Sequence, residues 1–401
     1  MVRTGLGQRL MTARNVLVIN CGSSSLKFAL IEPSSARVSH HGLAERLGTP
    51  EASLTIDGSA SEALDANADH GVALNRIFER VESDALTAVG HRVVHGGERF
   101  SESVLVNDEV VQRIEACSPL APLHNPANLQ GIAAARARFP EVPQVAVFDT
   151  AFHHRMPAKA YQYAVPYEWY ERYGLRRYGF HGTSHGYVAE RAAALLGRPL
   201  GELMLITAHL GNGCSACAIS GGQSVDTTMG LTPLEGLVMG TRSGDVDPNL
   251  HQFVAGQSGL GLTQISEILN KKSGLLGLSG ESNDMRALLE ARARGNARAA
   301  LAIDVFCYRL AKALLALGAG LERIDALVFT GGIGEHAAPI RAQTLAQLRI
   351  LGAEVDSALN DDHGRAENGR ITTTSSRLLA FVIPTNEELV IAREAVRFSS
   401  E

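Results

Sequence analysis

Short apolar runs alternate with longer stretches of helical periodicity along most of the chain. Eight runs have the length and the Val, Ile, Leu and Ala content of β-strands: 16–20, 27–31, 88–94, 144–148, 203–208, 215–219, 326–329 and 378–383. Three longer segments have helical spacing: 126–139 behind an Asn125 N-cap, 186–196 between a Ser184 cap and Gly197, and 296–317 before Gly318. Strands that alternate with helices predict an α/β architecture. The polar segment 51–68 is predicted to be a surface loop.

Composition narrows the class of protein. The 401 residues suggest two or three domains, and 45% hydrophobic with 20% charged residues is typical of a folded chain. Glycine contributes 40 residues, which predicts turns that bring backbone close to a ligand. A net charge of −5 gives no general attraction for nucleic acid or acidic membranes. The longest apolar stretch, 299–317, carries Asp304, Arg309 and Lys312, so no membrane span is expected.

Five scattered cysteines do not form a disulfide framework, so a reducing compartment, the cytoplasm, is expected. Cys214 and Cys217 have the spacing of a redox pair or half a zinc site, or they are buried packing residues. The lack of a second pair and their small neighbours favour packing. The first fourteen residues hold three arginines but no apolar segment of a secretory leader, and Met11 is an alternative start.

Two segments about 190 residues apart, 18–25 and 206–213, have the pattern of strand, polar glycine-containing turn and strand. They predict two hairpins in two related domains. In the first, small residues offer N–H groups and hydroxyls to phosphate, Lys27 adds a cation, and Asn20 an oxygen for Mg²⁺. Each turn has a plain alternative, a Ser-rich or Asn-Gly hairpin that binds nothing. The segment 328–335 runs from a strand into glycines before a helix, which suits a phosphate or nucleoside, but it matches neither a Rossmann nor a P-loop motif.

Charged residues in glycine-rich turns are the other candidates for chemistry. Arg92 and Arg242 lie in such turns and suit a carboxylate or a phosphate. Asp149 and Glu387 follow predicted strands, where a carboxylate serves Mg²⁺, a water or a proton, or else caps a helix. The adjacent histidines 153 and 154 face apart on any regular element and are interpreted as structural.

The chain resembles the acetate kinase family, within the superfamily of actin, sugar kinases and chaperone ATPases. The resemblance rests on nine stretches between Val18 and Leu389, in the order and spacing of the family: VINCGSSSLKF, GHRVVHGGE, PLAPLHNPANLQGI, VFDTAFH, YGFHGTSH, ITAHLGNG, GTRSGDVDP, FTGGIGE and IPTNEEL. It implies two RNase H-like domains that face each other across a nucleotide-binding cleft. The first domain would span 1–165 and be completed by 385–401, and the second, with the nucleotide site and the dimer interface, would span 166–384.

The resemblance also implies an activity: reversible transfer of the ATP γ-phosphoryl group to acetate, giving acetyl phosphate and ADP. Mg²⁺ would be required, with Mn²⁺ as a substitute. The expected assembly is a cytoplasmic homodimer with no nucleic-acid or membrane partner.

Residue roles carried over from the family fall into four groups. The catalytic positions are Asp149, His181 and Arg242. The positions for acetate are Arg92, Val94, Leu123, His124, Phe180 and Pro233. The nucleotide positions are Lys27, His209, Leu210, Gly211, Asn212, Gly213, Asp284, Met285, Arg286, Gly332, Ile333, Gly334, Glu335 and His336. The metal positions are Asn20 and Glu387.

Acetate is already an anion with no proton to lose, so Asp149 is expected to hold Mg²⁺ or its water, or to orient Arg92, rather than to act as a base. The chain departs from the family at His336, in place of an asparagine, and at Cys214, where small residues are usual. Three alternatives remain: a kinase for propionate or another short acyl group, a non-enzymatic actin-like nucleotide switch, and a sensor of acyl phosphate.

Overall fold

The computed structural model describes residues 15–81, 86–122 and 124–399, which divide into two compact units. The first holds the described residues up to His95, then Glu102–Phe148, then those from Glu388 onward. The second holds Gly96–Ser101 and Asp149–Glu387. The chain thus changes unit at Asp149, earlier than the predicted boundary at 165, because the segments just after Asp149 pack against strand β11 and helix α6 of the second unit.

Among the described residues of the first unit, eight strands form one sheet. Its strands are β1 (Asn15–Cys21), β2 (Leu26–Glu32), β3 (Arg37–Glu45), β4 (Ser53–Ile56), β5 (Glu62–Ala63), β6 (Leu86–Val93), β7 (Val104–Leu105) and β8 (Gln144–Phe148). Their order is β5–β4–β3–β2–β1–β6–β8–β7. β1, β2 and β3 are antiparallel neighbours, whereas β1, β6 and β8 run parallel.

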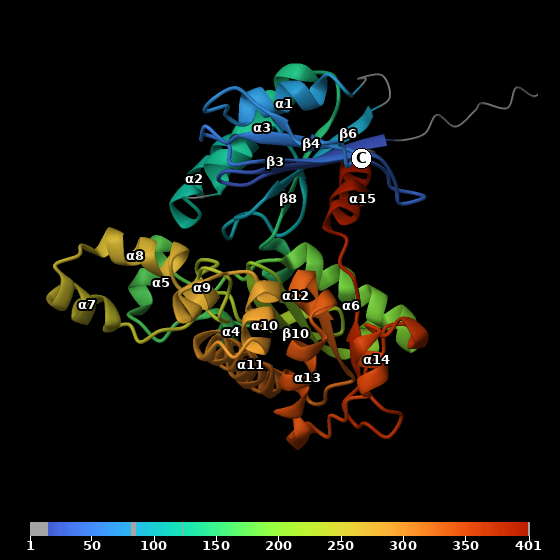
Figure 1. Ribbon diagram of the computed structural model, residues 1–401. Coiled ribbons are helices and arrows are strands. Elements are labelled where there is room, and N and C mark those ends of the chain that lie inside the picture. Colours follow the sequence, from blue (N-terminus) through green and yellow to red (C-terminus); the bar gives the residue numbers. More distant parts are fainter. Residues whose placement is uncertain (1–14, 82–85, 123, 400–401) are drawn as a thin grey trace, which may run out of the picture. The chain divides into compact units, whose positions relative to one another are not determined.

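Helices cover both faces of this sheet (Figure 1). They are α1 (His70–Phe78), α2 (Asp108–Ala116), the short 3₁₀ helix η2 (Ser118–Leu120), α3 (Asn125–Arg138) and α15 (Glu387–Ser399). α1 and α3 enclose a core with β1 in which Leu17, Ile19 and Leu74 are almost fully buried. On the other face α15 approaches so closely that a Cβ on Gly90 would lie 2.7 Å from Cγ2 of Ile391. Because both faces of β1 are covered, its sequence is a continuous apolar run.

The second unit repeats this topology in a five-stranded sheet. Its strands are β9 (Met204–Leu210), β10 (Cys214–Ser220), β11 (Gln223–Thr227), β12 (Ala326–Thr330) and β13 (Ala380–Val382), in the order β11–β10–β9–β12–β13. β9 is antiparallel to β10 and parallel to β12, as β1 is to β2 and β6. The predicted pair of related hairpins is therefore confirmed.

Most of the helices in the described ranges belong to the second unit. They are η3 (Ala151–His153), α4 (Ala158–Tyr161), α5 (Tyr167–Tyr173), α6 (Gly182–Leu196), η4 (Leu200–Glu202), α7 (Leu250–Ser258), α8 (Leu262–Lys271), α9 (Gly274–Ser279), α10 (Met285–Ala293), α11 (Ala297–Leu317), η5 (Gly318–Gly320), α12 (Gly331–His336), α13 (Ala338–Ala346), η6 (Arg349–Leu351), α14 (Ser357–Asp361) and η7 (Arg365–Glu367). α6 packs on β9 and β12 through buried residues that include Val188 and Ala192. Within the described ranges, no helix has the length and hydropathy that crossing a membrane requires.

All eight predicted strands are present, with ends shifted by at most two residues. The predicted surface loop 51–68 is wrong in part, since it contains β4 and β5. β4 pairs with β3 near the edge of the sheet, and only Leu54 of its four residues is buried, so it lacks a strand's alternating pattern.

Two predicted helix caps are also wrong. Asn125 lies inside α3, where its buried amide accepts from His95 N at 3.1 Å and donates to His95 O at 3.0 Å instead of capping. α6 begins at Gly182, so Ser184 lies within the helix, and its hydroxyl bonds Nδ1 of His209 at 2.8 Å. In both cases a tertiary hydrogen bond uses the side chain that local sequence assigns to the cap.

Candidate active site

His181 occupies a strained backbone position at the start of α6. Its φ of 57° lies in the left-handed region, which is costly for a residue with a side chain and is typical of functional sites. The strain is held by the next residue: Gly182 N donates to Asp149 O at 2.9 Å, and a Cβ on Gly182 would lie 2.4 Å from that oxygen. This close approach fixes His181 beside the residue that follows β8.

His181 and Arg242 converge on Gly213, in the turn between β9 and β10. A Cβ at Gly213 would stand 3.4 Å from His181 Nε2 and 3.5 Å from Arg242 Nη1. The guanidinium also has a backbone partner, since the same Nη1 donates to Pro233 O at 3.1 Å. An imidazole nitrogen and a permanent cation thus border one glycine, an arrangement suited to an anionic group.

A second imidazole supports the first. The rings of His181 and His209 stack with centroids 4.4 Å apart and planes inclined by 26°. His209 is the predicted start of the phosphate turn that continues through Leu210, Gly211 and Asn212, and Asn212 O accepts from Gly240 N at 3.0 Å. That bond ties the turn to the loop that carries Arg242.

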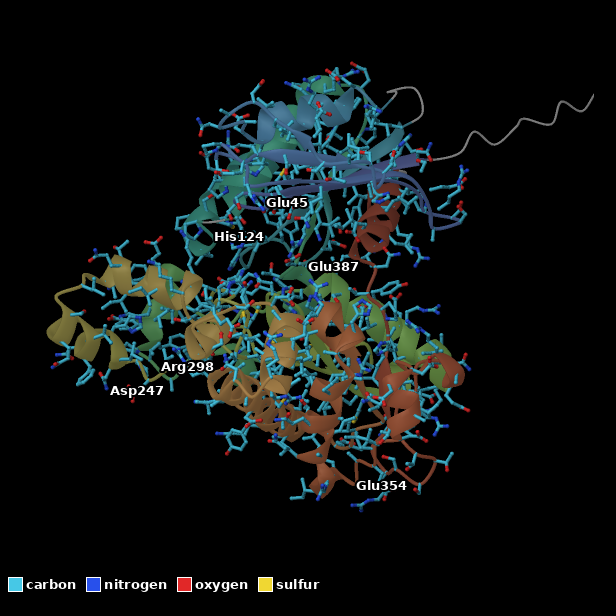
Figure 2. The ribbon with its side chains drawn as sticks, in the orientation of Figure 1. Glu45, His124, Asp247, Arg298, Glu354 and Glu387 are labelled. Atoms are coloured by element: carbon cyan, nitrogen blue, oxygen red, sulfur yellow. The ribbon has the colours of Figure 1, made fainter. Side chains whose placement is uncertain are left out.

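Glu387 begins α15 and is labelled in Figure 2. Its Oε2 accepts from the Thr183 hydroxyl at 3.3 Å, which links it to the first turn of α6. Asp149 is 1% exposed, directly after β8, and belongs with Glu387 to the second unit. Two of the predicted carboxylates therefore follow strand ends, as the sequence suggested.

The predicted nucleotide turn 332–336 forms α12, directly after β12. The Glu335 carboxylate accepts from Gly331 N at 2.9 Å and from Thr385 N at 3.2 Å, so this side chain braces the turn against the segment before Glu387. A Cβ added to Gly332 would have no neighbour within 4 Å, so the surface there is open, and His336 is exposed.

Two further groups complete the predicted set in this unit. Asp284 caps α10, and its carboxylate binds the exposed Arg286 side chain at 2.7 Å, next to Met285. Phe180 is buried, and its carbonyl accepts from His153 Nε2 at 2.9 Å.

In the first unit the strand ends of β1 and β6 bring Asn20 and Arg92 together. Arg92 Nη1 donates to Asn20 Oδ1 at 3.3 Å. Lys27 pairs with Asn20 across the β1–β2 hairpin and is exposed. Val94 is 5% exposed, and its N–H donates to the buried Asn128 amide at 3.0 Å, while Asn128 Nδ2 donates to Cys21 O. Asn128 thus holds the two predicted ligand-binding turns together.

His124 lies immediately before α3 (Figure 2) and is half-buried. Leu123, the remaining predicted acetate contact, lies outside the described residues. Of the two predicted metal positions, Asn20 belongs to the first unit and Glu387 to the second.

Burial suppresses the ionisation of several titratable groups that the sequence left open. His153 is completely buried between Ser224 Oγ and Phe180 O, and desolvation lowers its pKa to about 4, which agrees with a structural role. All five cysteines are buried free thiols, and desolvation raises the pKa of Cys214 and Cys217 to about 12. They are packing residues without thiolate character.

The two predicted metal positions each carry an oxygen of the kind that Mg²⁺ binds. Mg²⁺ usually takes one or two protein oxygens and fills its remaining positions with water and phosphate. Asn20 supplies an amide oxygen and Glu387 a carboxylate. Among the described residues no group of three or more His, Cys, Asp and Glu could hold a metal ion.

Sequence reasoning did not identify the buried residues that support the predicted site residues. Ser215 is hydrogen-bonded to His181 and also to His185. Asn128 accepts a hydrogen bond from the backbone of Val94, and the fully buried Arg341 donates to backbone carbonyls of α12. The signal for His185 was present, because residues 181 and 185 are four apart at the start of one helix and so share a face. Nothing local marks the others.

A groove of about 770 Å³ lies elsewhere in the second unit, along α11. Its walls include Val305, Arg309 and Lys312, and it is lined by none of the predicted site residues.

Residues 15–393 match the family model described as the acetokinase family. The chain belongs to the acetokinase family. It is 56% identical to the acetate kinase of Deinococcus radiodurans over 94% of this chain and 96% of that one, and 55% identical to the acetate kinase of Stutzerimonas stutzeri over 96% and 99%.

Solved structures agree. A propionate kinase from Francisella tularensis matches with a TM-score of 0.91 at 44% identity, covering 96% of this chain and 99% of that one. An acetate kinase from Porphyromonas gingivalis matches with a TM-score of 0.88 at 42% identity, covering 96% and 100%. The family membership predicted from the motifs and the predicted two-sheet α/β fold class are confirmed.

Proposed function

We propose that this protein is an acetate kinase that transfers the ATP γ-phosphoryl group reversibly to acetate, giving acetyl phosphate and ADP. The observation that carries the proposal is the convergence of His181 and Arg242 on Gly213, within 3.5 Å of one added atom. A transferring phosphoryl group spreads negative charge over three oxygens, and positioned donors and cations supply most of the stabilisation. Membership of the acetokinase family supports the same reaction.

In this reaction Arg242 and His181 stabilise the phosphoryl group in flight. Gly213 leaves room for it, because any side chain there would meet both donors. Asp149 has little reason to act as a base, since acetate carries no proton to remove. Its position at a strand end, with its backbone bound to Gly182, suits a carboxylate that orients a cation or a metal-bound water.

Arg92 binds the acetate carboxylate, with Val94 against the methyl group. The guanidinium is already oriented by Asn20 at 3.3 Å, which lowers the cost of ordering it on binding. His124, Phe180, Pro233 and Leu123 complete the acetate set.

The nucleotide binds to the turn 209–213, to the open backbone at Gly332 with its neighbours through His336, to 284–286, and to Lys27. The N-terminal end of α12 offers N–H groups close to β12, where a phosphate or ribose can approach. Asn20 and Glu387 would hold magnesium, which would neutralise phosphate charge when bound.

The protein acts as a homodimer in the cytoplasm. Leu301, Tyr308 and Leu315 recur every seven residues along α11 and are 54%, 56% and 37% exposed, so one face of this helix offers apolar surface to a second copy. The five unpaired cysteines suit a reducing compartment. Light scattering coupled to gel filtration measures the assembly directly.

One experiment tests the reaction: trapping of acyl phosphate by hydroxylamine with ATP, Mg²⁺ and acetate, propionate or butyrate. We expect hydroxamate from acetate at the highest kcat/KM and none when EDTA removes the metal. Nucleotide binding without hydroxamate from any acid would refute the proposal in favour of a nucleotide switch or a sensor.

Propionate is the second candidate acceptor, because a propionate kinase is among the solved structures that match 96% of the chain. The same assay separates the two, since the ratio of kcat/KM for acetate and propionate is the quantity at issue.

A further inference from the structure

A line of four hydrogen-bonded side chains runs into the second unit behind His181. His181 Nδ1 lies 2.8 Å from Ser215 Oγ, and that oxygen lies 2.8 Å from His185 Nε2. The line ends on β9, where His185 Nδ1 lies 2.7 Å from Thr207 Oγ1. The four side chains come from the start of α6, its first full turn, β10 and β9.

The inner members are sealed from solvent. Ser215, His185 and Thr207 are each 0% exposed. Desolvation, with the neighbouring His153 and His209, holds the pKa of His185 well below its usual value, so this ring is neutral and carries one N–H. Each inner hydroxyl and ring nitrogen must therefore find its partner within the line.

An arrangement in which Ser215 accepts from both rings would leave its own buried proton without an acceptor among the described residues, so two directions remain for the line. In one, His185 donates from Nδ1 to Thr207, Ser215 donates to His185, and His181 donates from Nδ1 to Ser215. That direction leaves the buried Thr207 hydroxyl as a donor without an acceptor, because among the described residues its side-chain oxygen contacts only His185. A buried unsatisfied donor is costly and rare.

In the other direction every proton is used. Thr207 donates to Nδ1 of His185, His185 donates from Nε2 to Ser215, and Ser215 donates to Nδ1 of His181. The proton of a neutral His181 must then sit on Nε2, the nitrogen that lies beside Gly213 and Arg242.

We propose that Thr207, His185 and Ser215 are positioning residues that fix His181 as its Nε2–H tautomer. The inference rests on the proposed function of His181 for its purpose: the ring donates a hydrogen bond to the phosphoryl oxygens while neutral, and Arg242 supplies the positive charge. It extends that function by naming three residues that contact neither substrate.

The tautomer is read directly by NMR. Protein labelled with ¹⁵N-histidine gives two-bond ¹⁵N–¹H correlations that show which ring nitrogen carries the proton, and the His181→Gln spectrum assigns the signal of His181. We expect an Nε2–H pattern for His181 in the wild type and an added Nδ1–H population in Ser215→Ala. His185→Gln, whose amide N–H₂ takes the place of Nε2–H, should keep the wild-type pattern.

Ser224→Ala is the matched control. It also removes a buried serine hydroxyl from a histidine, His153 Nδ1 at 2.7 Å, but neither of these two residues is a member of the hydrogen-bonded line. We expect Ser215→Ala to lower kcat roughly tenfold with little change in KM, less than the loss of a whole transition-state donor. Ser224→Ala should change thermal stability by a similar amount and leave kcat within about twofold.

An Nδ1–H pattern for His181 in the wild type, or an unchanged pattern in Ser215→Ala, would overturn the inference. The spectrum needs no turnover, so an Nε2–H tautomer in a protein without kinase activity would refute the proposed function and leave the positioning role standing.

Discussion

Gly213→Ala probes the proposed phosphoryl site with a single methyl group. The backbone at Gly213 does not have a positive φ, so alanine fits the local conformation without strain. The added carbon would stand 3.4 Å from His181 Nε2 and 3.5 Å from Arg242 Nη1, at the near limit of ordinary van der Waals contact. The fold should accept the substitution, but the space bordered by the two donors would be occupied.

The size of the effect follows from that geometry. A phosphoryl oxygen bound to either donor lies about 2.8 Å from the donor nitrogen, closer than the methyl group itself. Oxygen and methyl therefore compete for the surface of the same two groups, and at least one transition-state hydrogen bond is lost or stretched. Loss of one such donor costs about 10²- to 10³-fold in kcat, or roughly 3–4 kcal/mol. We expect a fall in that range, with KM for acetate changed much less.

Gly256→Ala provides the matched control. Gly256 lies within α7, has no neighbour within 4 Å of an added Cβ, and does not have a positive φ. Helix propensity predicts a gain of about 0.5–1 kcal/mol in stability and no change in turnover. Steady-state kinetics in the hydroxamate assay and thermal melts of both variants complete the comparison. A Gly213→Ala enzyme with wild-type kcat would show that the transferring group does not pass between His181 and Arg242.

Four other substitutions test separate parts of the structure. Arg242→Ala should lower kcat by roughly 10³-fold or more with smaller changes in KM, and a steep rise in the acetate KM at constant kcat would move this arginine to ground-state binding. Val94→Ala should shrink an acetate preference over propionate of about tenfold, mainly by improving propionate, and an unchanged kcat/KM ratio would remove Val94 from the acyl pocket. Arg341→Met should destabilise the fold by about 3–5 kcal/mol in urea unfolding. The carbonyls of Gly334 and Glu335 and the side chain of Asn360 would lose the donors of a fully buried guanidinium. A variant of wild-type stability would contradict this interpretation. His91 is buried and its pKa is lowered to about 4, so the unfolded chain binds the proton more readily and stability should fall as pH drops from about 6.5 toward 4. His91→Gln should reduce this loss of stability between pH 7 and pH 5, measured by unfolding at both values. An equal loss in both proteins would exclude His91 as its source.

The central strands could be predicted because they are buried on both faces. Continuous apolar runs such as 16–20 and 326–329 can be recognised as strands without knowing which strands they pair with. The ends of these strands in the structure lie within two residues of the predicted ends. The strand β4, next to the edge strand β5, could not be predicted: it pairs with β3, but three of its four residues are only half-buried. The caps failed for a related reason, since Asn125 and Ser184 use their side chains on distant backbone and on His209.

The residues placed at strand ends could also be predicted, because parallel strands carry their ligand-binding groups at one edge. Asn20 and Arg92 meet in this way. The supporting residues could not be predicted. Ser215 and Thr207 are ordinary small polar residues within strands, and the histidines to which they are hydrogen-bonded lie at the start of α6. Arg341 shows the limit most clearly: its sequence context suggests an ordinary surface arginine, yet this one is 0% exposed and binds neutral acceptors.

The repeated topology explains why the two candidate carboxylates lie where they do. In each unit the central parallel strand has a second parallel strand beside it, β8 next to β6 and β13 next to β12. Asp149 directly follows β8, and Glu387 follows β13 by five residues, so the two acids occupy corresponding strand ends of the two sheets. These are also points at which the chain passes from one unit to the other.

The two carboxylates have corresponding positions in the repeated topology but different surroundings. The backbone carbonyl of Asp149 accepts a hydrogen bond from Gly182 N in α6, whereas the side chain of Glu387 accepts one from the Thr183 hydroxyl. Because Asp149 is positioned through its backbone, its carboxylate suits the orientation of other groups. Metal binding is the role proposed for Glu387, and the orientation of a cation or a metal-bound water is the role proposed for Asp149.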